Sequence, residues 1–237
     1  MKGANMTYVM SDIHGNKIRF ESILKQIDLK PSDRLYILGD VVDRFPDGIE
    51  LLQRIRKMKN AVLLLGNHEY MMINSYAEQC GYRRKPFETE RARMLWARNH
   101  CGDTARAFKV MSAEDQKDLI EYLMSRKRYL YITVNGQKYL LVHGASPKGY
   151  EKDAFRTLTE FVVWNRVTEE TVQDDGSIMI FGHTPTVFYH QGEDMTVWHG
   201  KNMIGIDCGS GYYDGEVGTG CHLACLRLDD MKEFYSK

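Results

Sequence analysis

The stretch AVLLLGNHEYMM, residues 61–72, passes from an apolar run to a glycine, an amide, an imidazole and a carboxylate in direct succession. The apolar part, from Ala61 to Asn67, is short and ends on a polar turn, which is the pattern of a buried strand in a parallel or mixed sheet. Asn67 and His68 carry side chains that can bind a metal ion or move a proton. This stretch therefore predicts a buried strand that delivers chemically active groups at its carboxyl end.

Two earlier segments repeat this pattern, and helices fit between them. The runs TYVMSD, from residue 7, and RLYILGD, from residue 34, are also short and apolar and end on a carboxylate. Apolar residues with helical spacing lie between the runs and form two sets, Phe20, Ile23, Leu24 and Ile27, and then Ile49, Leu52, Ile55 and Met58. The N-terminal part of the chain therefore predicts a βαβαβ arrangement.

The middle of the chain, residues 70–128, is rich in charge and in helix formers, and it predicts a helical insertion. Strands resume at YLYITV and QKYLLVHG, which are joined by Asn135 and Gly136, a strong hairpin signal. Later strands are expected at SIMIFGH, MTVWH, MIGIDCG and CHLACLRL. We expect residues 1–237 to form a single domain, because this length suits one core better than two.

Composition excludes several classes of protein. The 237 residues are 43% hydrophobic, and 32 Lys and Arg balance 32 Asp and Glu, so the net charge points neither to nucleic acid nor to an anionic membrane. Apolar stretches of membrane-spanning length are missing, as is a signal-peptide core after MKGANM, so we expect a cytoplasmic protein. The five cysteines lack zinc-type pairing and are expected to be reduced, mostly buried thiols. The sequence gives no signal for an oligomeric state.

Polar and charged side chains follow five of the predicted strands: Asp12, His14, Asp40, Asp43, Arg44, Asn67, His68, Glu69, His143 and His183. Singly, they have plain structural interpretations, such as a helix cap for Asp12, a turn residue for Asn67 or a hydrogen-bonded strand end for His143. Together they indicate one site, because strand ends line the ligand crevice of an open α/β sheet. Carboxylates, an amide and imidazoles without a thiolate suit manganese, iron or zinc, and six ligands require two ions.

The ordered motifs DxH, GDxVDR, GNHE, HG and GHTP resemble the phosphoprotein phosphatase family of calcineurin-like metallophosphoesterases. With VVWNR from Val162 and IFGHTPTV from Ile180, the chain is most similar to the bacterial and bacteriophage branch typified by the lambda protein phosphatase. The resemblance covers nearly the whole chain and is weakest at residues 70–128. It implies an α/β fold in which two mixed β-sheets form a sandwich flanked by helices, with the metals at the strand ends.

The resemblance also assigns roles. Two divalent metal ions, manganese first with iron or zinc as alternatives, would be bound by Asp12, His14, Asp40, Asn67, His143 and His183, with Asp40 bridging them and a shared hydroxide attacking phosphorus. His68 would protonate the leaving oxygen, and Asp43 would orient His68. Arg44 and Arg166 would bind phosphate oxygens, although Arg166 also fits an ordinary surface arginine beside a core tryptophan. Glu69 is expected to anchor a turn or a helix start.

These roles predict a dinuclear serine/threonine or dual-specificity protein phosphatase that acts on phosphorylated proteins or peptides. One alternative is hydrolysis of dinucleoside polyphosphates such as diadenosine tetraphosphate, by a similar branch that more often shows GNHD than GNHE. A non-catalytic phosphoprotein-binding module is another alternative, and it would lack a ligand or the acid. Two departures from the family leave substrate preference open: Phe45 follows Arg44 where glycine is usual, and Leu65 precedes Gly66 where arginine is usual.

Overall fold

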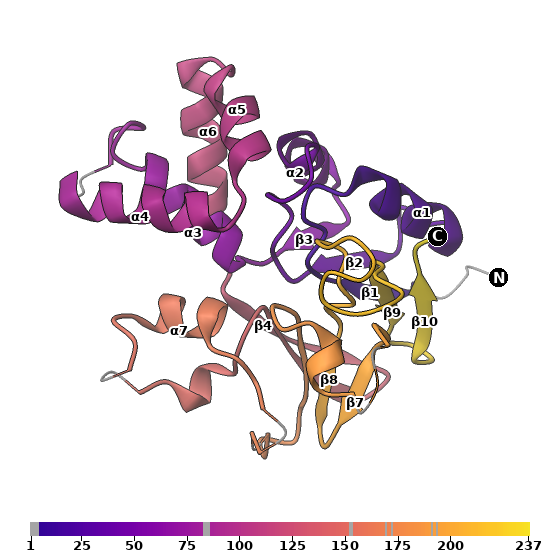
Figure 1. The fold of residues 1–237 in the computed structure, drawn as a ribbon. Coiled ribbons are helices and arrows are strands. Elements are labelled where there is room, and N and C mark those ends of the chain that lie inside the picture. The colour runs from indigo at the N-terminus through magenta and orange to yellow at the C-terminus, as the bar shows by residue number, and fades with distance from the viewer. Residues whose placement is uncertain are drawn as a thin grey trace.

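Two five-stranded sheets organise the chain in the computed structural model, which describes residues 5–82, 86–151, 154–168, 170–171, 173–190, 192 and 194–237 (Figure 1). The first sheet has the order β10-β9-β1-β2-β3, with β1 Thr7–Met10, β2 Arg34–Ile37, β3 Ala61–Leu63, β9 Ala224–Arg227 and β10 Lys232–Tyr235. The second has the order β4-β5-β6-β8-β7, with β4 Tyr129–Val134, β5 Gln137–Val142, β6 Ile178–Phe181, β7 Trp198–Gly200 and β8 Met203–Gly205.

The two sheets are mixed, and they share an apolar interior. β9 runs antiparallel to both β1 and β10, and β4 and β7 run antiparallel to their neighbours, while the other pairs are parallel. One buried cluster joins Val9 and Leu226 of the first sheet to Leu141, Ile180 and Ile204 of the second. Side chains on the two inner faces of a sandwich form such a common core. The predicted α/β fold with two mixed sheets in a sandwich is confirmed.

Helices cover the first sheet where the apolar spacing predicts them. α1 (Lys17–Ile27) connects β1 to β2, and α2 (Gly48–Lys57) connects β2 to β3. α1 buries Phe20, Ile23 and Ile27, as its spacing predicts, whereas Leu24 is only partly buried. The predicted βαβαβ opening is therefore present, and its two crossovers place strands β1, β2 and β3 side by side in parallel.

Four helices occupy the charged middle of the chain: α3 Asn67–Tyr76, α4 Pro86–Arg98, α5 Gly102–Lys109 and α6 Ala113–Met124. They form a group that projects away from the two sheets (Figure 1). α3 begins at Asn67, so the GNHE motif lies in the first helical turn and not before it. A short helix, α7 (Leu158–Trp164), follows β5 and ends just before Asn165 and Arg166.

Several local features differ from or add to the sequence expectations. β10, which closes the edge of the first sheet, has no counterpart among the predicted strands, and β7 starts only at Trp198, later than MTVWH suggests. Leu65 is buried and belongs to the apolar core. The five cysteines are free and buried, as expected. Within the described residues, no helix has both the length and the apolar character needed to cross a bilayer.

Each sheet contains three neighbouring parallel strands, and the residues that follow these strands include the predicted site residues. β1, β2 and β3 pair in parallel in the first sheet, and β5, β6 and β8 pair in parallel in the second. The carboxyl ends of parallel strands lie on one edge, where open α/β folds bind ligands. The residues that follow these six strands include Asp12, Asp40, Asn67, His143, His183 and Asp207.

Candidate active site

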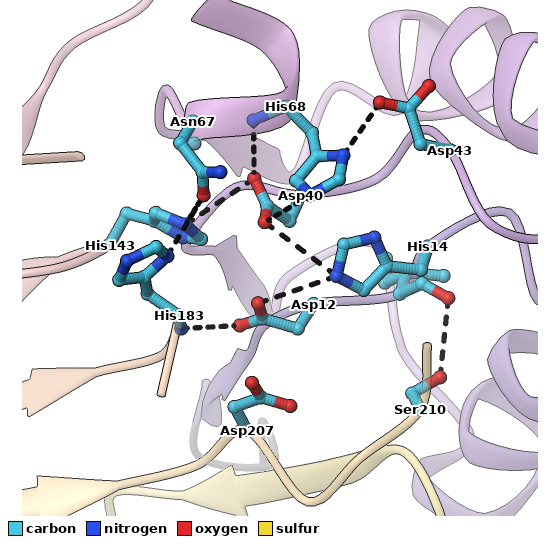
Figure 2. A network of polar contacts seen from close by, with 12 residues as sticks. Asp12, His14, Asp40, Asp43, Asn67, His68, His143, His183, Asp207 and Ser210 are labelled. Carbon is cyan, nitrogen blue, oxygen red and sulfur yellow. Dashed lines mark hydrogen bonds and ion pairs between the residues drawn. The ribbon is translucent and has the colours of Figure 1, made fainter. Parts of the chain in front are cut away.

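The strand ends bring nearly all of the predicted site residues into one buried cluster. Figure 2 shows the side chains of Asp12, Asp40, His14, His68, His143 and His183 turned toward one another. Many of these residues adopt a left-handed backbone with φ between 52° and 72°, namely Asp12, His14, Asp40, Asp43, Arg44 and His183. This conformation is uncommon for residues other than glycine and occurs where surrounding structure enforces it, often at functional sites.

Asp40 lies at the centre of the cluster. Its Oδ2 is 3.7 Å from His14 Nε2 and 3.8 Å from His68 Nε2, while its Oδ1 is 3.4 Å from His143 Nε2. The backbone N–H of His68 donates a 3.0 Å hydrogen bond to Asp40 Oδ1. A carboxylate that reaches several imidazoles through both oxygens has the position expected of a ligand shared by two cations.

Hydrogen bonds behind the cluster orient the imidazoles. Nδ1 of His143 lies 2.9 Å from the Leu38 carbonyl, and Nε2 of His183 lies 3.1 Å from the Trp164 carbonyl. Because a carbonyl oxygen only accepts, these two ring nitrogens carry the protons. The other nitrogens, His143 Nε2 and His183 Nδ1, then face the Asn67 amide oxygen at 2.9 and 3.0 Å.

When both imidazoles are neutral, His143 Nε2, His183 Nδ1 and the Asn67 amide oxygen are all hydrogen-bond acceptors. These three atoms lie together, and none of them supplies a donor to the others. Such an arrangement is unfavourable when empty of positive charge and favourable around a shared cation. On the other side, His14 Nδ1 lies 3.1 Å from the Val42 carbonyl, so His14 Nε2 faces Asp12 Oδ1 and Asp40 Oδ2 with its lone pair. The donor atoms fall into two groups, each within 4.8 Å: His14, Asp40 and His68, and then Asp40, His143 and His183. The residues present therefore fit a pair of divalent cations.

Burial and neighbouring charges shift the pKa values of several residues in the buried cluster. Burial and the nearby Asp207 carboxylate raise the pKa of Asp12 to about 8. Burial and the charge of His143 lower the pKa of His183 to about 3. For His143 burial acts to lower the pKa, but the Asp40 carboxylate outweighs it and raises the pKa to about 9. The raised pKa values mean that Asp12 and His143 tend to hold protons when no cation is bound. Bound cations would replace these protons, because cations favour ionised carboxylates and neutral imidazoles.

His68 stands apart from the other histidines by its partner. Its Nδ1 lies 2.6 Å from Asp43 Oδ2, and its Nε2 faces the cluster. Burial acts to lower the pKa of His68, but the Asp40 charge and the hydrogen bond with Asp43 outweigh it, so the pKa is raised. Asp43 is itself held, because Trp96 Nε1 donates a 2.6 Å hydrogen bond to Oδ2 and the Asp43 backbone N–H donates to Thr104 Oγ1. This arrangement can keep a proton on a correctly aimed imidazole.

Glu69 is a scaffold residue. Its carboxylate is fully buried and accepts hydrogen bonds from the backbone N–H groups of Gly66, Asp40, Val41 and Val42. It thereby fastens the start of α3 to the turn after β2, which carries Asp40, and it confirms the expected anchoring role. Gly66 is required beside it, because a Cβ there would collide with the Asp40 carboxylate.

The two predicted phosphate-binding arginines lie on different sides of the cluster. The Arg44 guanidinium carbon lies 4.3 Å from the Tyr212 ring centroid, and the charge of Arg44, after burial, helps to lower the pKa of His14. Arg166 is exposed and donates a 3.2 Å hydrogen bond to Thr184 Oγ1, beside His183. Arg44 is therefore on the His14 side and Arg166 on the His183 side.

Sequence reasoning missed Asp207. Asp207 is buried beside Asp12, and burial raises its pKa. The signal was available, because Asp207 ends the predicted MIGIDCG strand in the same way that Asp12 and Asp40 end theirs. Gly211 covers the cluster so closely that a Cβ would collide with the His14 ring and the Arg44 guanidinium.

The calcineurin-like phosphoesterase family matches residues 7–207, which hold every candidate metal ligand. The chain belongs to this family. It is accordingly a metallophosphoesterase, a hydrolase of a family that uses divalent metal ions, and its described residues include the two donor groups at the strand ends. The calcineurin-like fold predicted from the motifs is confirmed.

Similar proteins carry a consistent name. The symmetrical bis(5'-nucleosyl)-tetraphosphatase of Erwinia tasmaniensis is 32% identical over 138 residues, 57% of this chain and 42% of that protein. The protein of the same name from Stutzerimonas stutzeri is 27% identical over 179 residues, 74% of this chain and 54% of that protein. This chain thus spans about half the length of these relatives. A crystal structure of a candidate diadenosine tetraphosphatase has a similar fold, with a TM-score of 0.62 at 15% identity and coverage of 99% and 94%.

The prediction of a serine/threonine protein phosphatase with a phosphorylated protein or peptide as partner is wrong. The relatives are named tetraphosphatases of dinucleosides and not lambda-type protein phosphatases. GNHE and WNR together favoured the phosphatase interpretation, and the structure gives a physical reason why the Glu69 of GNHE misled it. Because its carboxylate is buried and accepts only backbone N–H groups, Glu69 carries no information on the substrate.

Proposed function

We propose that this chain hydrolyses a phosphoric anhydride bond in the phosphate chain of a dinucleoside polyphosphate. The observation that carries this proposal is the name of its curated relatives, symmetrical bis(5'-nucleosyl)-tetraphosphatase. The site supports it chemically, because cationic groups lie on both sides of the cluster, Arg44 beside His14 and Arg166 beside His183. A chain of several phosphates needs positive charge at more than one point along its length.

We assign the metal ligands as the family resemblance implies them. One divalent ion would be held by Asp12 and His14, the other by Asn67, His143 and His183, with Asp40 between them. Asp207, buried beside Asp12, adds negative charge on the side of the first ion. When bound, such a pair lowers the pKa of a water molecule and screens the charge of the phosphates. Oxygen and nitrogen donors without thiolate favour manganese, with iron or zinc as alternatives.

The protein's own side chains would do the rest. Arg44 and Arg166 would bind the oxygens of the phosphate under attack and of its neighbours. As water adds to phosphorus and the bridging P–O bond breaks, His68 would donate its Nε2 proton toward the leaving phosphate oxygen. Asp43 would hold the imidazole through Nδ1, and the products of central cleavage would be two nucleoside diphosphates.

Product analysis tests the proposal. With manganese supplied, the protein should convert diadenosine tetraphosphate into ADP as the sole nucleotide product, and the Asp40→Asn variant should not. Chromatography separates this outcome from asymmetric cleavage, which gives ATP and AMP. Lack of turnover in a folded, metal-loaded protein would overturn the proposed function, and formation of ATP and AMP would overturn central cleavage.

A further inference from the structure

Two neighbouring residues of the β2–α2 turn meet two neighbouring residues of the loop after β8. The Arg44 guanidinium lies over the Tyr212 ring, and the Phe45 ring lies against the Tyr213 ring, with centroids 5.1 Å apart and planes inclined by 58°. The turn and the loop thus form one surface whose cationic part adjoins its aromatic part. Phe45 stands where the family usually has glycine, so this aromatic contact is a departure of this chain.

This surface lines a pocket of about 580 Å³. Gly211 forms its inner wall, packed on the His14 ring and Arg44. Arg98, from the end of α4, adds a second cation to the lining, and the backbone N–H of Arg44 donates to the His100 carbonyl at 3.1 Å, which fixes that end of the helix beside the turn. The pocket lining therefore includes two arginines, Arg44 and Arg98, and one carboxylate, Glu216.

The outer part of the pocket is an aromatic platform. The Tyr213 side chain is 66% exposed, although its ring is large and apolar. Phe45 supports one side of this ring, and Glu216 accepts a 2.8 Å hydrogen bond from the Tyr213 backbone N–H. Arg19 of α1 donates to the carbonyls of Ser210 and Tyr212 at 2.8 and 3.1 Å, which fixes the loop from below. The platform is thus held in place before a ligand arrives, which lowers the entropic cost of binding.

We propose that this pocket binds one nucleoside of the substrate, with its base stacked on the Tyr213 platform that Phe45 supports and its phosphates at Arg44. The proposal rests on the proposed function and names a part of the substrate that the metal cluster does not bind. Every nucleobase offers a planar face to an aromatic ring, and cations beside that ring bind the attached phosphates. Arg44 and Phe45 are adjacent in the chain, so the phosphate site and the base site lie close together. A nucleotide has the same arrangement, because a single sugar joins its phosphate to its base.

A pair of ligands that differ only in the nucleoside tests the pocket. The methylene analogue of ADP and methylenediphosphonate carry the same two phosphorus groups, and neither has an anhydride oxygen to lose. Calorimetric titration of the manganese-loaded protein should show at least tenfold tighter binding of the nucleoside ligand. In Tyr213→Leu that preference should fall about tenfold, the size of one lost base–aromatic stack. Tyr213→Phe, which keeps the ring, should retain it within about twofold, and Phe45→Leu should fall between the two.

The outcomes separate the pocket from the reaction. Equal affinity of the wild-type protein for both ligands would overturn the nucleoside site, as would an unchanged preference in a folded Tyr213→Leu variant. Lack of diadenosine tetraphosphate hydrolysis alongside a Tyr213-dependent preference would overturn the proposed function and leave the pocket standing. The selectivity ratio of kcat/KM for diadenosine tetraphosphate over inorganic tetraphosphate gives a second measure, and it too should fall about tenfold in Tyr213→Leu.

Discussion

Individual residues of this site are held in costly conformations and environments. Asp40 combines a left-handed backbone, with φ of 54°, and complete burial of a carboxylate among imidazoles. A residue in the left-handed region costs about 1 kcal/mol or more, and a buried carboxylate costs more unless it is compensated. Burial acts to raise the pKa of Asp40, but the charges of His143 and His68 outweigh it and lower the pKa well below its usual range. The free-energy cost of burying the Asp40 carboxylate is therefore compensated by the positive charge next to it.

The central position of Asp40 predicts that its substitution affects both ions. Asp40→Asn should retain fewer than two metal ions per chain by elemental analysis and lose activity by about a thousandfold, because several kcal/mol of transition-state stabilisation come from the metal pair. Asp118→Asn, on the exposed face of α6, is the matched control and should behave as wild type. Two retained metals with near-normal turnover in Asp40→Asn would contradict the shared-ligand role.

His68 predicts a pH dependence of defined sign. Burial acts to lower its pKa, but the Asp40 charge and the hydrogen bond with Asp43 raise it, and a general acid must carry its proton, so kcat should fall as pH rises through that pKa. His68→Asn should lose this alkaline limb and lower kcat by about a hundredfold, the lower end for general acids, since a nucleoside diphosphate is a better leaving group than an alkoxide. Metal content should hardly change. An alkaline limb that persists in His68→Asn would assign it to another group.

At the scale of secondary-structure elements, three separate segments position the proposed acid, His68. Asp43 follows β2, His68 is in the first turn of α3, and Trp96, near the end of α4, donates to the same Asp43 oxygen that faces His68. α4 also packs on α3 through the Trp96 and Tyr76 rings, with centroids 5.7 Å apart. The indole hydrogen bond of Trp96 thus connects α4 to the carboxylate that holds His68, and Trp96 is a positioning residue.

Removal of this indole donor should be visible in kinetics. Trp96→Phe keeps an aromatic ring but loses a hydrogen bond to a buried carboxylate, a change worth about 1.5–3 kcal/mol, so kcat should fall about tenfold or more. The alkaline limb of the pH profile should shift as well, because Asp43 helps to set the pKa of His68. Trp198→Phe, which lies in β7 against Tyr189, is the control. A purely structural role would lower stability and leave the pH profile in place.

At the scale of the whole molecule, the site joins the two sheets. The first sheet leads to Asp12, Asp40 and Asn67, and the second leads to His143 and His183, so neither sheet holds a complete ligand set. The backbone N–H of His183 donates to Asp12 Oδ2 at 3.0 Å across this junction. We therefore propose that residues 1–237 work as a single domain, with a helical insertion at about residues 70–128.

Metal binding should accordingly stabilise the whole fold, with a pH dependence set by the junction. In the metal-free protein the pKa of Asp12 is about 8 and that of His143 about 9, both above their unfolded values. Such groups contribute stability that is complete below the unfolded pKa and lost as pH rises through the folded one. The Tm of the metal-free protein should therefore fall by about 5 °C or more between pH 7 and pH 9.5.

Calorimetry or circular dichroism with and without manganese checks this expectation. The metal-loaded protein should lose less stability over the same interval, because the cations replace the bound protons and need the ionised carboxylate and the neutral imidazole. The increase in Tm on adding metal should thus be larger at pH 9 than at pH 7. A metal effect on Tm that shrinks as pH rises would contradict this assignment of the buried protons.

The sequence by itself determined the described strands other than β10, the first two helices and the candidate metal donors at the strand ends. These follow from local patterns, since apolar runs, helical spacing and a polar residue at a strand end are all read within a few neighbours, as in LGNHE and LGD. The parallel order of the strands then requires Asp12, Asp40 and Asn67 to meet at one edge. Asp207 belonged to the same pattern and could have been found with it.

Only the tertiary structure decided what those residues touch. The hydrogen bond from Trp96 to Asp43 spans 53 positions, and the contact of Phe45 with Tyr213 joins β2–α2 to the loop after β8. Glu69 shows the consequence most directly, because its motif favoured the wrong substrate while its carboxylate accepts only backbone N–H groups. Contacts between distant segments depend on the packing of the whole chain, so no local pattern contains them.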